Sequence, residues 1–129
     1  MLSLPDATRV LRAAGESTRL RLLALCALRE WSVTELAASI GQSEPRVSRH
    51  LKVLCDAGLL RRARRGKWVC YAAATEGDVA SLVSTLLSRI DGADAVRRRD
   101  AQRAASSARD LRPAAPRTSK LGRAIAGFV

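Results

Sequence analysis

Apolar residues recur with helical spacing along most of the chain up to residue 97, and Gly or Pro residues separate the runs. This pattern predicts helices over residues 6–14, 18–28, 32–40, 43–58 and 78–97. The second of these is apolar on nearly every side, which is typical of a helix at the centre of a fold. The fifth has the clearest period, with one unbroken stripe made of Val79, Leu82, Val83, Leu86, Leu87 and Ile90.

The third and fourth predicted helices are separated only by a Gly-Gln turn at residues 41–42. Ser32 and Glu35 have the spacing of a capping box at the start of the third helix. Ser43 is suited to cap the fourth helix, and Gly58 supplies the left-handed residue that ends it. Two helices joined by a tight turn predict a helix-turn-helix unit.

The fourth predicted helix has an apolar face and a polar face. Its apolar face consists of Val47, Leu51 and Leu54, which lie at i, i+4 and i+7. The polar face and its flanks carry Arg46, Ser48, Arg49 and Lys52. Arg, Lys and Ser side chains reach phosphates or base edges when such a helix lies in a DNA major groove. For this helix taken by itself, a solvated basic face is the alternative.

Two short segments after the fourth helix have the composition of β-strands. Residues 59–63 and 68–72 flank a Gly-containing turn at residues 64–67, which predicts a hairpin with an Arg-Arg-Gly-Lys tip. A basic hairpin that directly follows a basic helix is suited to press on the backbone or the minor groove of DNA. The combination favours DNA binding over a merely solvated face.

Residues 8–73 closely resemble the ArsR family of winged helix-turn-helix repressors. Four blocks carry the resemblance, in the family's order and spacing: GESTRLRLL at 15–23, PRVSRHLK at 45–52, DAGLL at 56–60 and RGKWVCY at 65–71. The resemblance implies a mainly α fold with a small β-hairpin, a winged helix-turn-helix that dimerises through its terminal helices. It also implies a sequence-specific DNA-binding transcriptional regulator, a repressor, that acts as a homodimer on an inverted-repeat operator.

DNA contacts are expected from the turn, the fourth helix and the hairpin tip. The expected residues are Gln42, Ser43, Pro45, Arg46, Ser48, Arg49, His50, Lys52, Arg64, Arg65 and Lys67. Ser48 and Arg49 are expected to contribute to the choice of DNA sequence, whereas the hairpin tip is expected to add mainly backbone affinity. His50 lies near the buried edge of its helix, where a packed or a phosphate-contacting role is expected.

In the family that the chain resembles, the first and last helices form the dimer interface. The expected interface residues are Val10 and Leu11 on the first helix, and Val79, Leu82, Val83, Leu86, Leu87 and Ile90 on the last. A helix at the C-terminal edge of a small domain has little surface of its own chain left to cover. This favours a second copy over the chain's own core as the partner of the apolar stripe.

The chain is strongly basic, because its 129 residues carry a formal net charge of +11. Such a charge indicates a polyanionic partner, here double-stranded DNA. The excess lies in residues 46–67 and 97–123. We expect one DNA-binding and dimerisation domain over residues 1–97, followed by a basic, largely flexible tail over residues 98–129. The tail is either a non-specific DNA arm or the remnant of a linker to a lost domain.

No metal and no cofactor are expected. The family's arsenic-type site is a Glu-Leu-Cys-x-Cys run, whereas residues 30–34 here read Glu-Trp-Ser-Val-Thr and lack both cysteines. The family's zinc-type site uses Asp and His pairs on the last helix, and the one His of this chain is His50. Cys26, Cys55 and Cys70 are expected to be small buried hydrophobes, with a thiol switch at Cys55 or Cys70 as the alternative. A small-molecule or thiol-reactive inducer stays open and unidentified.

The competing functional class is an enzyme. Residues 41–59 are similar in wording to ArsR-like domains that precede an S-adenosylmethionine-dependent methyltransferase, but no Gly-rich turn after a strand follows here. No pair of acid and base side chains is placed for catalysis, so no enzymatic activity is expected. The alternative function is the regulatory half of a truncated methyltransferase fusion. The sequence shows no signal peptide or membrane-spanning run, and its three widely spaced cysteines favour a reducing, cytoplasmic location.

Overall fold

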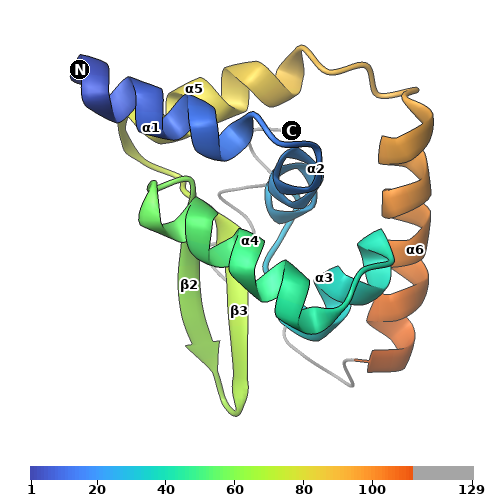
Figure 1. Ribbon diagram of the computed structural model, residues 1–129. Coiled ribbons are helices and arrows are strands. Elements are labelled where there is room, and N and C mark those ends of the chain that lie inside the picture. The colour runs from blue at the N-terminus through green and yellow to red at the C-terminus, as the bar shows by residue number, and fades with distance from the viewer. Residues whose placement is uncertain (112–129) are drawn as a thin grey trace.

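The computed structural model describes the backbone of residues 1–111 and the side chains of residues 1–106 (Figure 1). The elements are α1 (Leu4–Ala14), α2 (Ser17–Cys26), β1 (Trp31–Ser32), α3 (Val33–Ile40), α4 (Glu44–Asp56), β2 (Leu60–Arg65), β3 (Trp68–Ala73), α5 (Gly77–Ser88) and α6 (Ala95–Leu111). Helices α3 and α4 form the helix-turn-helix, and β2 and β3 form the hairpin that follows it. The fold is therefore a winged helix-turn-helix, as expected.

The helix-turn-helix has the local signals that its sequence predicts. Ser32 Oγ accepts from the Glu35 N–H at 3.2 Å, and Glu35 Oε1 accepts from the Ser32 N–H at 3.0 Å, so the capping box is confirmed. Gly41 and Gly58 follow α3 and α4 with φ of 70° and 81°, the left-handed region that favours glycine. Ser43 occupies the N-cap position of α4, but its hydroxyl makes no capping hydrogen bond within the described part of the chain.

Two other helix starts differ from the expected ones. Helix α1 begins at Leu4 rather than at residue 6, because Ser3 Oγ accepts from the Asp6 N–H at 3.1 Å and caps it. Helix α2 begins at Ser17 rather than at residue 18 and is capped by Glu16, since Glu16 Oε2 accepts from the Arg19 N–H at 3.0 Å. Burial alone would raise the pKa of Glu16, but hydrogen bonds from the backbone N–H groups of Arg19 and Thr18 outweigh it and lower that pKa.

The sheet has three antiparallel strands in the order β1-β3-β2. Strand β1 pairs Trp31 with Tyr71; it was not expected, because a strand of two residues has no alternation to detect. Strand β2 continues to Arg65, which pairs with Trp68, so the turn consists of Gly66 and Lys67 rather than residues 64–67. The hairpin is thus longer and its tip smaller than expected.

The core lies around α2, as its nearly all-apolar surface predicts. Leu22, Leu23 and Cys26 of α2 are fully buried. The apolar face of α4 (Val47, Leu51 and Leu54) is fully buried against it, which confirms the predicted orientation of this helix. The opposite face of α4 is left to solvent.

The prediction of a single helix over residues 78–97 is wrong, because the structure has two helices there. Helix α5 ends at Ser88, and α6 starts at Ala95, where Asp94 Oδ1 accepts from the Arg97 N–H at 3.0 Å and marks a new helix start. Helix α6 lies along α3 (Figure 1), with Asp100 and Ala104 buried. The expected flexible tail from residue 98 therefore begins, in this structure, as a helix packed on the domain. Residues 112–129 of that tail lie outside the described residues.

Candidate nucleic-acid interface

The exposed face of α4 brings together most of the residues expected to contact DNA. Ser43, Pro45, Arg46, Ser48, Arg49 and Lys52 are all exposed. Lys52 Nζ lies 2.9 Å from Asp56 Oδ2 one turn later, a solvent-screened pair that another anion can exchange. Arg49 Nε lies 3.4 Å from the Pro45 carbonyl, toward the helix start. The arrangement offers hydroxyl and guanidinium groups on one convex surface.

Gln42 lies at the start of this surface but faces inward. Its Nε2 donates to Thr18 Oγ1 of α2 at 3.1 Å. Its Oε1 is buried and has no hydrogen-bond partner among the described residues. The amide therefore joins the turn to α2, and the DNA contact expected from the sequence stays a prediction.

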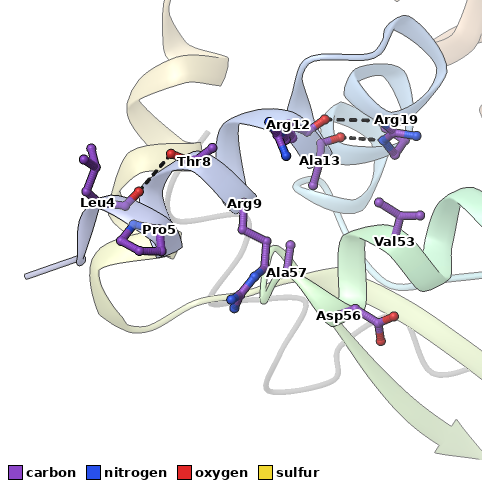
Figure 2. Close-up of a pocket in the computed structure, with 10 residues that line it drawn as sticks. All are labelled: Leu4, Pro5, Thr8, Arg9, Arg12, Ala13, Arg19, Val53, Asp56 and Ala57. Atoms are coloured by element: carbon purple, nitrogen blue, oxygen red, sulfur yellow. Dashed lines mark hydrogen bonds between the residues drawn. The ribbon is translucent and has the colours of Figure 1, made fainter.

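His50 is held on the inner flank of α4 by residues of α2. His50 Nδ1 lies 3.3 Å from Arg19 Nη1 and 3.8 Å from Glu16 Oε2. Arg19 also donates from Nε to the Ala13 carbonyl at 2.6 Å and from Nη2 to the Arg12 carbonyl at 3.2 Å (Figure 2). A guanidinium that satisfies the last carbonyls of α1 thus connects α1, α2 and α4. These contacts are consistent with the packed role expected for His50, and its phosphate-contacting role stays a prediction.

Arg19 was missed by sequence reasoning, although a cation a few residues after a helix end is a known way to satisfy its carbonyls. Arg21 was missed as well. Its guanidinium donates to the carboxylate of Asp100, which lies 79 residues later in the chain. No local pattern reveals such a pair.

An open groove of about 700 Å³ lies between α1 and the C-terminal part of α4 (Figure 2). Apolar side chains such as Val53 and three arginines line it, together with one acid, Asp56. Asp56 is paired with Lys52, and Thr8, the one hydroxyl in the lining, donates to the Leu4 carbonyl at 2.9 Å. The groove therefore brings together no acid–base pair of the kind that catalysis needs.

The hairpin presents all three of its expected cations, Arg64, Arg65 and Lys67, to solvent. Arg65 also forms a bidentate pair with Glu30, from Nε to Oε1 at 2.7 Å and from Nη2 to Oε2 at 3.1 Å. Glu30 is buried, and its hydrogen bond with Arg65 raises the pKa of that guanidinium. Arg65 thus fixes the hairpin to the loop before β1, and its expected contact with the DNA backbone stays a prediction.

The segment that matches the family's arsenic-type site is used here for packing. Trp31 Nε1 donates to the Leu25 carbonyl at 2.7 Å, and the Arg29 guanidinium lies 3.2 Å from the centre of the Trp31 ring. Ser32 and Glu30 serve the capping box and the hairpin pair described above. Within the described ranges, no group of three or more His, Cys, Asp or Glu side chains could hold a metal ion.

The three cysteines are free thiols in poorly reactive surroundings. Cys26 and Cys70 are buried, and Cys55 is half-buried. Burial raises the pKa of Cys26 and, to a smaller extent, that of Cys55, so the reactive thiolate form is disfavoured at both. These surroundings match the expected role of small buried hydrophobes.

The residues expected at a dimer interface divide into two sets. Leu11 on α1 and Leu82 and Leu86 on α5 are exposed, and Leu4 of α1 joins them. Val10, Val83 and Leu87 are buried in the chain's own core, and Val79 and Ile90 are half-buried against it. The stripe on α5 therefore serves the chain's own core along one side and leaves leucines exposed along the other. None of the helices within residues 1–111 is long and apolar enough to cross a bilayer.

Comparison with known proteins places this geometry among bacterial regulators. Residues 16–62 match the profile of the family described as "Bacterial regulatory protein, arsR family". A 64-residue stretch is 39% identical to the "Arsenical resistance operon repressor" of Escherichia coli K12. This match covers 49% of this chain and 55% of that protein. A longer stretch of 93 residues is 41% identical to the "Probable mercury resistance operon repressor" of Streptomyces lividans, covering 70% of each chain.

A solved structure has the same architecture. The chain is similar to a homodimeric winged helix-turn-helix DNA-binding domain from Mycobacterium bovis, with a TM-score of 0.62 and 30% sequence identity, over 70% of this chain and 83% of that one. The repressor BigR from Xylella fastidiosa is similar too, with a TM-score of 0.57 and 29% identity, over 67% of this chain and 88% of that one. The chain spans between a half and two thirds of the length of the curated Escherichia coli and Pseudomonas putida arsenic regulators that it matches.

Proposed function

The chain belongs to the arsR family of bacterial regulatory proteins, and from this premise we propose that it is a sequence-specific DNA-binding repressor. It acts as a homodimer on an inverted-repeat operator, and it represses by occupying that operator. The observation that carries the proposal is helix α4, whose fully buried apolar face turns Ser48, Arg46 and Arg49 toward solvent together. This family consists of transcription regulators and not of enzymes.

The DNA-binding step follows from the two faces of α4. One recognition helix from each subunit enters the major groove, in half-sites about 34 Å apart. Ser48 and Arg49 reach base edges, while Arg46, Arg64 and Lys67 reach phosphates. Gln42, His50 and Arg65 contribute indirectly, since their side chains hold α2, the end of α1 and the hairpin in place around α4.

The homodimer is proposed to form through α1 and α5. The exposed leucines Leu4, Leu11, Leu82 and Leu86 supply an apolar surface that a monomer leaves in water. The Mycobacterium bovis relative, described as homodimeric, supports this assembly. Dimerisation sets the spacing of the two recognition helices, so it is required for an operator of two half-sites.

Selection of DNA sequences from a random pool tests the proposed function. The wild-type protein should enrich an inverted repeat, and Arg49→Ala should relax the base preference at one position of each half-site. Loss of a bidentate base contact of this kind costs about 1–3 kcal/mol of discrimination. Arg64→Ala is the control, because removing a phosphate contact weakens binding and leaves the selected sequence unchanged. An unaltered profile for Arg49→Ala would place α4 outside the major groove.

Binding is also proposed to need no metal. The relatives named above are an arsenical and a mercury resistance operon repressor, but the corresponding segment here is occupied by Trp31 and Ser32 in structural contacts. Affinity for the selected site should therefore change less than about tenfold, or about 1.4 kcal/mol, after treatment with a chelator. A larger change in a gel-shift titration would reveal a metal-dependent step, and an added soft metal ion is the matched counter-experiment.

The location of the protein and an alternative function are also proposed. The reducing cytoplasm, where bacterial DNA is held, is the proposed location, and free cysteines are compatible with it. The alternative function, the regulatory part of a methyltransferase fusion, has the wording of residues 41–59 as its support. A methyltransferase coding region in frame after this sequence would favour it.

A further inference from the structure

Helix α6 is fixed against the helix-turn-helix by a buried ion pair. Arg21 of α2 donates to both oxygens of Asp100, from Nε at 2.8 Å and from Nη2 at 2.9 Å. The same Nη2 donates to the Ile40 carbonyl at the end of α3 at 3.0 Å. Asp100 is only 2% exposed, and its hydrogen bond with Arg21 raises the pKa of that guanidinium. One arginine therefore sets the position of α6 relative to the turn that leads into α4.

Two cations of α6 lie on the side of that turn. Arg103 packs its guanidinium against Gly41, where a Cβ would lie 3.0 Å from Arg103 Nη1. Arg99 lies one helical turn before Arg103 and so projects from the same side of α6. Both side chains are exposed. None of the ion pairs among the described residues involves either of them.

The charges of Arg99 and Arg103 form no ion pair that stabilises the described part of the fold. Like charges four residues apart destabilise a helix, so Arg99 and Arg103 cost free energy in the isolated chain. Between residues 95 and 106 the one acid is Asp100, and Arg21 already neutralises it. An anionic partner outside the chain would relieve this repulsion.

The place of α6 in the fold identifies that partner. In Figure 1 the hairpin and α6 stand on opposite sides of α4. The major groove is about 12 Å wide, close to the diameter of one helix, so phosphate backbone lies on both sides of a recognition helix. We propose that Arg99 and Arg103 bind backbone phosphates of double-stranded DNA on the side of α4 opposite to the hairpin. This inference rests on the proposed DNA binding and adds a third contact element to it.

The test measures how the affinity of the full chain for a random-sequence duplex depends on salt. Each phosphate contact contributes about 0.9 to the slope of log K against log salt concentration. R99Q/R103Q should therefore lower the slope by about 1.8 for each subunit bound. R89Q/R98Q is the matched control, because Arg89 and Arg98 are also exposed and carry the same charge, but lie away from Gly41. Its slope should stay within roughly 0.5 of the wild type.

A second variant separates charge from folding. R99K/R103K retains the charges and should retain nearly the wild-type slope, even if R99Q/R103Q lowers the melting temperature. Equal losses in R99Q/R103Q and R89Q/R98Q would mean that overall charge alone matters, and this would overturn the inference; so would an unchanged slope in R99Q/R103Q. Failure of the proposed function has a different signature, since the wild-type protein itself would then not bind duplex DNA.

Discussion

Arg64 and Arg65 are adjacent in β2, and their surroundings give the two guanidinium groups different tasks. Both are exposed, but Arg65 also makes two charge-assisted hydrogen bonds to the buried carboxylate of Glu30. Alternation along a strand places neighbouring side chains on opposite faces, so only one of the two can lie toward Glu30. The same residue type therefore supports the hairpin at one position and is free to meet DNA at the next.

Substitution by Ala should separate these two tasks. Arg65→Ala is expected to lower the free energy of unfolding by about 1–3 kcal/mol, because the buried carboxylate of Glu30 loses two charge-assisted hydrogen bonds. Arg64→Ala should change it by less than about 0.5 kcal/mol and should lower the salt slope of DNA binding by about 0.9 per subunit. Urea unfolding and binding titrations measure the two effects. Equal stability of both variants would show that the Glu30 pair contributes nothing net to folding.

At the scale of elements, α5 serves the chain's own core on one side and faces solvent on the other. Val83 and Leu87 are buried in the core, while Leu82 and Leu86 are 38% and 37% exposed. A helical period alone does not distinguish these faces, because both belong to one broad apolar stripe. Burial in the folded chain places Val83 and Leu87 in the core and leaves Leu82 and Leu86 exposed, and the place of these two leucines in a dimer interface is a prediction.

Substitutions on the two faces should therefore have different consequences. Leu86→Asp is expected to convert the dimer into a folded monomer, because a charge on the exposed face opposes only association. Val83→Asp should instead unfold the chain, since it buries a charge in the core. Sedimentation and circular dichroism measure assembly and folding separately. Ser81→Asp, also on exposed α5 surface, is the control and should stay dimeric. A dimer that survives Leu86→Asp would remove α5 from the interface.

The elements that the sequence predicted well are those with local signals. The capping box at Ser32, the turn at Gly41, the left-handed Gly58 and the apolar face of α4 each depend on residues close together in the chain. The elements it missed depend on distant partners. Strand β1 exists only because Tyr71 and Cys70 pair with it. Helix α6 is separate from α5 because it packs on α3, which lies far away in the sequence.

The candidate site follows the same division. The polar face of α4 could be predicted, because its apolar residues repeat with helical spacing and fix which side turns outward. The hydrogen bonds that tie Gln42 and Arg65 to the domain could not be predicted, since their partners Thr18 and Glu30 lie 24 and 35 residues earlier. Charge and polarity suggest DNA contacts, but only the fold decides which polar groups are already occupied.

At the scale of the whole molecule, α6 joins the basic C-terminal region to the DNA-binding domain. Stopping the chain after Asp94 should lower the free energy of unfolding by at least about 3 kcal/mol, because Arg21 loses the buried carboxylate of Asp100. The measurement is urea unfolding of this truncation beside the full chain. A truncation that removes α6 therefore lowers both the positive charge and the stability of the domain, so its effect on DNA binding cannot be assigned to charge alone. Equal stability of the two chains would mean that α6 does not support the helix-turn-helix.

A stop after Leu111 asks the cleaner question about the last segment. It leaves all described elements intact and removes four cations without an acid, namely Arg112, Arg117, Lys120 and Arg123. If this segment is a DNA arm, binding to random duplex should weaken at low salt and converge with the full chain at high salt, because counterion release depends on the charges removed. If it is linker, both chains should bind equally at every salt concentration. The arm is the expected outcome, since cations tethered to a DNA-bound domain stay close to its phosphates.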